Sequence, residues 1–306
     1  MFFRNLTLFR FSPAVADDLQ RLDEALDDRR LRPCGPLELF TRGFVPPVGR
    51  ADGWDSLTLT ENGCTLAMLG GEDKLLPPAV LTDALQRKVR QITEQEGRNV
   101  GGRERKRIRE DLLTELLPRA FVRSSRTAAY ADIANGWLVI DTASRKQADT
   151  VLTCWREALG SFPAVPPAPE EGPRVLLTDW LATGRLPAGF ALGDECELRD
   201  PATAAGAVIR ARRQDMDAEE VKEHLRSGKQ VFKLGLVYDD RISFVLGEDL
   251  VLHKLRFLDV VLDTLGDSLQ DAHDEAAAAL FLMTTELRRL LEQLAEVFGL
   301  PRPGDA

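Results

Sequence analysis

The chain has 306 residues, of which 44% are hydrophobic and 29% charged, and its formal net charge at pH 7 is −9. This composition is typical of a globular protein with enough sequence for two or three structural units. The pI near 5.1 excludes a protein that is basic throughout, but not a binder of polyanions whose positive charge is confined to part of the surface.

The start of the chain and the cysteines predict a cellular compartment. The apolar stretch MFFRNLTLFRF is interrupted by Arg4 and Arg10, which argues against a signal peptide. The sequence has no run of about 18 to 20 apolar residues, so no membrane span is expected. The four cysteines are scattered, without a C-x-x-C pair or a histidine at ligand spacing. This pattern favours free thiols in a cytoplasmic protein and no zinc site.

In chain order, the first predicted elements are a strand, a helix and a hairpin. The pattern NLTLFRF predicts a strand over 5–11, and the apolar spacing that follows predicts a helix over 15–29. Within LTLTENGCTLAMLG (57–70), the pair Asn62 and Gly63 is the preferred chemistry of a type I′ turn. We therefore expect the chain to open as an α+β unit.

Two consecutive helices are expected next. Apolar residues between Val80 and Ile92 recur at three- and four-residue steps, and the glycines of 97–102 interrupt the pattern. A second helix should start near Arg103 and end at Pro118, which cannot continue the hydrogen-bond ladder. At 1.5 Å per residue, two helices of roughly 15 to 20 residues form a hairpin about 25 Å long. We interpret this hairpin as a projecting helical arm.

The rest of the chain continues the alternation of strands and helices. TAAYADIANGWLVIDTA (127–143) predicts two strands that turn at Asn135 and Gly136, and the proline-rich stretch 161–174 predicts a linker. The other expected elements are a helix over 145–159, a helix over 175–184, a strand over 206–215, a short helix capped by Asp217 with Glu220 at the capping-box position and Gly228 at its end, an antiparallel meander over 229–259, and a helix over 274–299.

These elements predict an α+β fold with antiparallel sheets and flanking helices. We divide it into three domains. The first is a central α+β domain formed by 1–76 with 127–165. The helical arm, 77–126, is inserted in it. A C-terminal α+β base domain covers 173–306, after the linker.

Positive charge is concentrated in two places. Between Arg87 and Arg126, twelve basic residues stand against six acidic ones, a local excess of six charges. The run RERKRIRE (103–110) has a simpler reading as a solvated helix face with local ion pairs to Glu104 and Glu110. The second basic patch consists of Arg210, Arg212, Arg213, Lys229 and Lys233. Because few aromatic residues lie among these cations, the pattern favours contact with a duplex backbone over stacking with single-stranded bases.

No chemistry for catalysis is apparent in the sequence. The three histidines, His224, His253 and His273, have no motif partners, and neither glycine-rich nucleotide-binding motif is present. The compact Glu-Asp-Lys group at 72–74 resembles a nuclease metal site but is more simply a solvated loop. We therefore expect no catalytic residue, no metal and no cofactor.

Four segments carry a resemblance to a known family. They are RPCGPLELFTRGFVPPVG (32–49), LLPRAFVRSS (116–125), VIRARRQDMDAEEV (208–221) and FLMTTELRRLLEQL (281–294). In order and spacing they resemble the bacterial recombination-associated RdgC family over essentially the whole chain. The resemblance implies a ring-shaped homodimer with a positively charged hole that encircles duplex DNA without marked sequence specificity. It also implies restraint of the RecA recombinase, association with the nucleoid and no enzymatic activity.

The resemblance and the basic patches together assign candidate residues. The predicted DNA contacts are Arg98, Arg103, Arg105, Lys106, Arg107, Arg212, Arg213, Gln214, Lys229 and Lys233. The family's hydrophobic dimer contact falls on Phe121, beside Leu116 and Leu117, although Phe121 also fits an ordinary core aromatic. The expected partners are double-stranded DNA, with single-stranded DNA as a second ligand, another copy of the chain and, functionally, RecA. The alternatives are a protein-interaction module that acts directly on a recombinase, and a metal-dependent nuclease.

Overall fold

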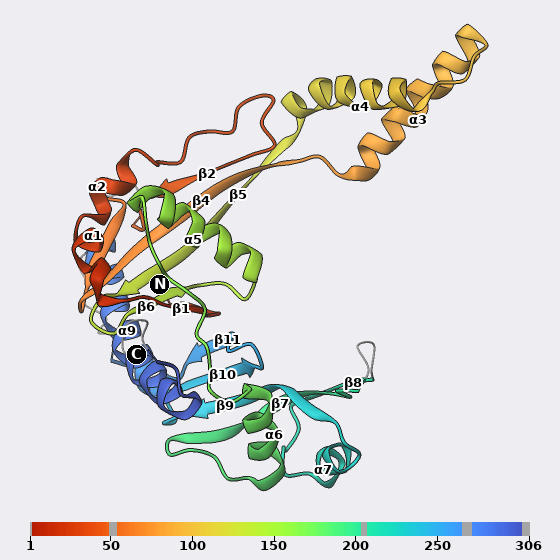
Figure 1. Cartoon of the computed structure of the whole chain (residues 1–306). Helices are drawn as coiled ribbons and strands as arrows, with labels where there is room; N and C mark the ends of the chain where they lie inside the picture. Colours follow the sequence, from red (N-terminus) through yellow and green to blue (C-terminus); the bar gives the residue numbers. More distant parts are fainter. Residues whose placement is uncertain (1, 49–53, 203–206, 265–270, 302–306) are drawn as a thin grey trace. The chain divides into compact units, whose positions relative to one another are not determined.

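The computed structural model describes residues 2–48, 54–202, 207–264 and 271–301 (Figure 1). They form a mixed α+β structure with antiparallel sheets, as the sequence predicts. The chain divides into two compact units. The first unit contains Met1–Asp28, Pro46–Met68 and Thr127–Ala306, and the second contains Arg29–Val45 and Leu69–Arg126.

One sheet has six strands, in the order β1-β6-β5-β4-β2, with β3 paired to β4. Its strands are β1 (Thr7–Arg10), β2 (Phe40–Val45), β3 (Thr58–Glu61), β4 (Cys64–Leu75), β5 (Phe121–Asp132) and β6 (Trp137–Ile140). The hairpin of β3 and β4 turns at Asn62 and Gly63, which both have positive φ, so the predicted turn is confirmed. The long strands β4 and β5 each run from one unit into the other.

The other sheet has five strands and lies entirely within the first unit, in the order β11-β10-β9-β7-β8. Its strands are β7 (Phe190–Arg199), β8 (Val208–Arg212), β9 (Gln230–Tyr238), β10 (Ile242–Gly247) and β11 (Leu252–Phe257). All neighbouring pairs are antiparallel, and the predicted meander is formed by β9, β10 and β11. One face packs into the core through residues such as Leu234, Leu236 and Phe244, which leaves polar side chains on the other face.

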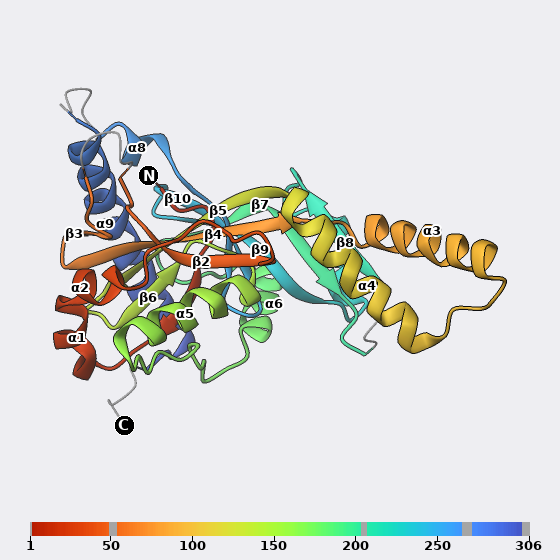
Figure 2. The ribbon, with the colours of Figure 1, turned by 90° about the horizontal axis from the view of Figure 1, so that it is seen from above.

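The helices follow the predicted pattern closely. They are α1 (Ala16–Gln20), α2 (Leu22–Asp27), α3 (Pro78–Glu96), α4 (Gly102–Leu116), α5 (Arg145–Leu159), α6 (Pro173–Thr183), α7 (Glu219–Arg226), α8 (Asp259–Leu262) and α9 (Ala272–Phe298). Helices α3 and α4, joined through the glycines of 97–102, contact each other (Figure 2). In the first unit, α5 buries Ala148, Val151, Leu152 and Trp155 on one face. That face matches the apolar periodicity of its sequence.

Two expected features differ in the structure. The helix predicted over 15–29 is interrupted at Arg21, whose φ of −101° and ψ of 19° are not helical, so it forms α1 and α2. Leu19 and Leu22 are nevertheless both buried. Asp217 is not the N-cap of α7: the N-cap is Ala218, without a side-chain hydrogen bond, so no capping box forms. The backbone N–H of Asp217 instead donates to the side chain of Asp215, which shifts the start of the helix.

The turn between β5 and β6 requires a glycine at position 136. Asp132 pairs with Trp137, so β5 and β6 are joined by the four residues 133–136. Gly136 has φ of 66°, and a Cβ there would lie 2.5 Å from the carbonyl oxygen of Phe11. The backbone N–H of Phe11 also donates to the carbonyl oxygen of Gly136. A side chain would separate these two segments, so this turn requires glycine.

Candidate nucleic-acid interface

Helix α4 carries a row of exposed cations, which we call the α4 surface: Arg103, Arg105, Lys106 and Arg107. Of the residues of α4, Ile108 alone is buried. Because residues three and four apart share a helix face, Arg103, Lys106 and Arg107 lie away from the face of Ile108. Arg105, three residues before Ile108, is exposed as well. The α4 surface therefore results from the same amphipathic pattern that fixes the orientation of the helix.

Arg98 is held by one carboxylate at the end of α3 and one at the start of α4. Its Nη1 and Nη2 each donate to a carboxylate oxygen of Glu104 at 2.7 Å, and its Nε donates to Glu96 at 2.6 Å. The hydrogen bond from Arg98 is the main cause that holds the pKa of Glu104 below its ordinary value. Arg98 was predicted as a DNA contact, but its guanidinium is already engaged in linking the two helices.

The cations of the α4 surface itself are nearly unpaired. In the part of the chain that the structure describes, the side chains of Arg103 and Arg105 make no hydrogen bond and no ion pair. Lys106 lies 4.0 Å from Glu110, and both side chains are mostly exposed. Exposed pairs of this kind contribute little free energy. The simpler reading of RERKRIRE, a helix face neutralised by its own acids, therefore accounts poorly for these residues.

The second basic surface starts on β8, the edge strand of the five-stranded sheet. Val208, Arg210 and Arg212 are exposed, while Ile209 and Ala211 are half-buried. Arg213 does not continue the alternation, because its φ of 53° takes it out of the strand. Charged side chains on an edge strand also discourage it from pairing with another chain.

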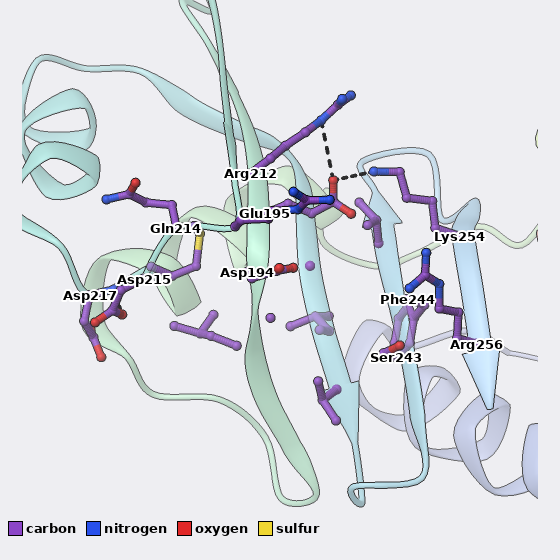
Figure 3. A pocket seen from close by; sticks show the side chains of 18 residues that line it. Asp194, Glu195, Arg212, Gln214, Asp215, Asp217, Ser243, Phe244, Lys254 and Arg256 are labelled. Atoms are coloured by element: carbon purple, nitrogen blue, oxygen red, sulfur yellow. Dashed lines mark hydrogen bonds and ion pairs between the residues drawn. The ribbon is translucent and has the colours of Figure 1, made fainter. Parts of the chain in front are cut away.

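An open groove of about 1070 Å³ lies on the polar face of this sheet, and Figure 3 shows its lining. Its basic side chains come from the end of β8 and from β11: Arg212, Arg213, Lys254 and Arg256. Gln214 and Ser243 add neutral polar groups, and Asp194, Glu195, Asp215 and Asp217 add carboxylates. We call this feature the sheet groove. It offers hydrogen-bond donors of the kind that bind phosphate oxygens.

Glu195 and Glu197 pair with the cations beside them. Glu195 lies 3.9 Å from Nε of Arg212 and accepts a hydrogen bond from Lys254. Glu197 accepts from Arg210 at 2.7 Å and from Arg199. Burial raises the pKa of Glu197, but the hydrogen bonds from Arg210 and Arg199 outweigh it and leave this pKa below its ordinary value. Glu197 is therefore charged near neutral pH, and its carboxylate partly neutralises the basic side chains beside it.

The structure brings some of the predicted residues together and leaves others apart. Arg212, Arg213 and Gln214 all line the sheet groove. Lys233 lies on the same face, opposite Glu197 in the register of β9 with β7, but not in the groove lining. Lys229 precedes β9, and its Nζ donates to Ser227 at 2.9 Å.

Two cations of the groove, Lys254 and Arg256, are absent from the prediction. Both lie in HKLRF on β11, the far edge of the sheet from β8. The signal in the sequence is the alternation of exposed Lys254 and Arg256 with buried Leu255. This pattern places both cations on one face of a strand, but does not tell which other strands share that face.

The predicted dimer residues differ in exposure. The side chain of Phe121, at the start of β5, is 83% exposed, so the alternative that it is a core aromatic is wrong. Leu116 is half-buried, and Leu117 is only 6% exposed, which leaves it little surface for another chain. Phe121 is the most exposed of the large apolar side chains among the described residues, and the next residue, Val122, is 43% exposed, so the two make a candidate contact site.

Two further features of the described residues bear on function. Among the described residues, the one group of His, Cys, Asp or Glu close enough to share a metal ion is Asp271, His273 and Asp274, outside both basic surfaces. Along the same described segments, no helix combines the length and apolar character needed to cross a bilayer.

Comparison with known proteins gives a consistent result. Residues 1–300 match the family model described as "Putative exonuclease, RdgC". Proteins named "Recombination-associated protein RdgC" from Xanthomonas campestris pv. campestris and Xanthomonas axonopodis pv. citri are 48% and 49% identical to the chain over 303 residues, 99% of each chain. The protein of the same name from Xylella fastidiosa is 49% identical over 291 residues, 95% of both chains. The chain therefore belongs to the RdgC family of recombination-associated proteins.

Proposed function

We propose that the protein binds double-stranded DNA through its phosphate backbone and without sequence preference. The observation that carries this proposal is the α4 surface: among the described residues, Arg103 and Arg105 have no carboxylate partner, and Lys106 has only the exposed Glu110, 4.0 Å away. Such cations gain free energy when they replace the counterions condensed on DNA. The sheet groove supports the proposal with Arg212, Arg213, Lys254 and Arg256. Helix α4 has no aromatic residue, and Phe244, the aromatic residue in the lining of the sheet groove, is 3% exposed. Neither surface therefore offers a platform for stacking bases, which favours duplex over single-stranded DNA as the main ligand.

We further propose that the protein acts as a closed, ring-shaped homodimer. One copy offers each basic surface once, and a second copy would double the number of phosphate contacts and enclose the duplex. The helical hairpin of α3 and α4 would act as the arm of each copy. The exposed side chain of Phe121 supports an apolar contact between copies, with Leu116 at its margin. Lys106 and its neighbours would then line the path of the duplex.

In the cell, we propose that DNA bound in this way is less accessible to the RecA recombinase, so that the protein restrains recombination and acts at replication forks on the nucleoid. The names of its relatives link them to recombination. The family description also contains the word exonuclease. We propose binding without hydrolysis. Among the described residues, the group close enough to share a metal ion is Asp271, His273 and Asp274, and it includes no carboxylate of the sheet groove.

The proposal can be tested by fluorescence anisotropy with a labelled duplex of about 30 base pairs, over a series of salt concentrations. The logarithm of the binding constant should fall linearly with log salt, with a slope of about −0.9 for each phosphate neutralised. The triple variant Arg105→Ala, Lys106→Ala, Arg107→Ala should bind more weakly and show a flatter slope. Binding that is indifferent to salt and to these residues would overturn the proposal.

A matched triple variant controls for net charge. Lys146→Ala, Arg226→Ala and Arg289→Ala remove the same charge from exposed positions outside both basic surfaces. Equal losses in the two triple variants would show that total charge, and not the α4 surface, governs affinity. Incubation of the duplex with Mg²⁺ or Mn²⁺ tests hydrolysis separately, and the expected result is intact DNA. Restraint of RecA by a variant that no longer binds DNA would contradict the proposed mechanism.

A further inference from the structure

The sheet groove owes its shape to a close backbone approach at Gly235 and to a register shift. Between the pairs Leu192–Leu236 and Cys196–Leu234, β7 advances four residues while β9 advances two. A Cβ on Gly235 would lie 2.9 Å from the carbonyl oxygen of Glu195. Only glycine permits so close an approach of two backbones, and the extra residues of a bulge redirect the side chains that they carry. The bulge of β7 therefore brings Glu195 onto the polar face of the sheet.

A second irregularity directs Lys254 toward the same place. Between the pairs Ser243–Arg256 and Val245–His253, β10 advances two residues while β11 advances three. The extra residue on β11 accompanies a φ of 53° at Lys254, a conformation that residues other than glycine avoid. The ammonium group of Lys254 reaches Glu195, although β10 and β9 lie between their strands (Figure 3).

Two basic residues of this groove have a strained backbone conformation, with positive φ. Among the described residues other than glycine, two cations have positive φ, Arg213 and Lys254, and both line the sheet groove. Strained conformations that the surrounding structure maintains are found preferentially at functional sites. The local backbone thus supports a binding role for the groove independently of its charge.

Glu195 lies between two cations of the groove. A single carboxylate oxygen, Oε2, faces both Nε of Arg212, at 3.9 Å, and Nζ of Lys254. The side chain of Glu195 is 19% exposed, so it lies in the groove and not in free solvent. Carboxylate and phosphate oxygens are recognised by the same donors, namely guanidinium and ammonium groups. By contrast, Arg213 and Arg256 have no ion pair within the described residues.

We infer that Glu195 is an internal counter-ion that competes with the DNA phosphate for Arg212 and Lys254. This inference rests on the proposed function, that the protein binds duplex DNA. Before DNA binds, Glu195 accepts a hydrogen bond from Lys254 and attracts Arg212 from 3.9 Å. A phosphate must displace the carboxylate from these cations, so the measured affinity is lower than the two cations alone would give. Weaker contact of this kind favours a protein that moves along DNA over one that stays at a single place.

The test is the variant Glu195→Gln, which removes the charge and nearly preserves the shape of the side chain. It should bind the labelled duplex of about 30 base pairs about five- to tenfold more tightly than wild type at about 0.15 M salt. Glu292→Gln is the matched control: Glu292 is exposed on α9, outside the groove lining, and its loss changes the net charge equally. An equal gain in both variants would overturn the inference, since total charge would then explain it.

A double-mutant cycle separates competition from simple repulsion. In a background with Arg212→Ala and Lys254→Ala, the gain from Glu195→Gln should disappear, because no cations remain for Glu195 to hold. A gain that persists there would mean that Glu195 only repels phosphate, which contradicts the inference. Glu195→Asp, which keeps the charge but shortens the side chain, should give an intermediate gain. It also provides a second test if Glu195→Gln does not fold, as thermal unfolding would show.

The two levels of failure are distinguishable. Wild-type protein that does not bind the duplex at any salt concentration would overturn the proposed function, and this inference with it. Wild-type protein that binds, with Glu195→Gln binding equally or more weakly, would overturn the inference alone.

Discussion

Arg288 of α9 donates from Nε to Asp132 at the end of β5, with a nitrogen–oxygen distance of 2.9 Å. Nη2 of the same guanidinium donates to the carbonyl oxygen of Asn62, also at 2.9 Å. The carboxylate of Asp132 also accepts a hydrogen bond from the side-chain amide of Asn135, at 2.8 Å. One arginine therefore ties the closing helix to the hairpin of β3 and β4 and to the turn between β5 and β6. This contact stabilises the first unit, which also carries the sheet groove.

Replacing Arg288 should destabilise the protein strongly. Asp132 is 3% exposed, so Arg288→Ala leaves a buried carboxylate without its charged partner. The expected loss in the free energy of unfolding is about 3 kcal/mol. The neighbouring Arg289 pairs with Asp239 at 3.2 Å at the surface, and Arg289→Ala should cost under about 1 kcal/mol. Urea denaturation of both variants measures the difference, and similar losses would contradict this account.

The buried cysteines should be unreactive in the folded protein. Burial, and next the charge of Asp132, raise the pKa of Cys64 to about 12, and burial raises the pKa of Cys196 to about 11. The nucleophilic form is the thiolate, so at about pH 8 iodoacetamide should label both thiols only after unfolding. Half-buried Cys34 serves as the internal comparison. Mass spectrometry of labelled peptides checks this, and rapid labelling of Cys64 in native protein would contradict it.

The same raised pKa values predict a loss of stability in alkali. The unfolded thiols release protons near pH 9, whereas the folded ones keep them up to about pH 11 to 12. The unfolded state therefore binds fewer protons in this range, and the free energy of unfolding should fall as pH rises from 9 toward 12. Urea denaturation at several pH values tests the sign. A flat profile over this range would show that the two thiols titrate equally in both states.

The predicted dimer contact can be separated from folding because Phe121 is 83% exposed. Phe121→Ser should leave the stability of a single copy nearly unchanged but weaken association by roughly 2 to 4 kcal/mol, because the apolar contact is lost. Analytical ultracentrifugation over a concentration series measures the association constant. Val175→Ser, at an apolar residue of α6 that is 61% exposed, is the control. Unchanged association in the Phe121 variant would remove this residue from the proposed interface.

Local patterns in the sequence predict much of the fold. Helix α5 has its predicted bounds, since Ser144 caps its start and its apolar residues are all on one face. The hairpin at Asn62 follows from turn chemistry alone. Asp217 was predicted wrongly as a helix cap: it lies in the turn before α7, where its backbone N–H donates to Asp215, and the N-cap is Ala218. Sequence alone does not show at which of several neighbouring polar residues a turn ends and the helix begins.

The candidate site is less accessible to prediction from the sequence. Arg212 was identified from charge and from the family resemblance, whereas Lys254 was not. Its role depends on two register shifts and on the approach of β7 to β9 at Gly235, which are set by tertiary packing. Likewise, hydropathy does not distinguish buried Leu117 from exposed Phe121, because both lie close to Pro118 in an apolar stretch.

The strained conformation of Lys254 gives a prediction in which stability and DNA binding change separately. Lys254→Ala and Lys254→Gly both remove the ammonium group, so both should weaken DNA binding equally. Only glycine adopts a φ of 53° without strain, so the glycine variant should be more stable than the alanine variant by roughly 1 kcal/mol. Thermal unfolding measures the stability difference and fluorescence anisotropy the affinity. If alanine were the more stable variant, the backbone at this position would not be strained, and the argument that the fold maintains Lys254 for binding would lose its support.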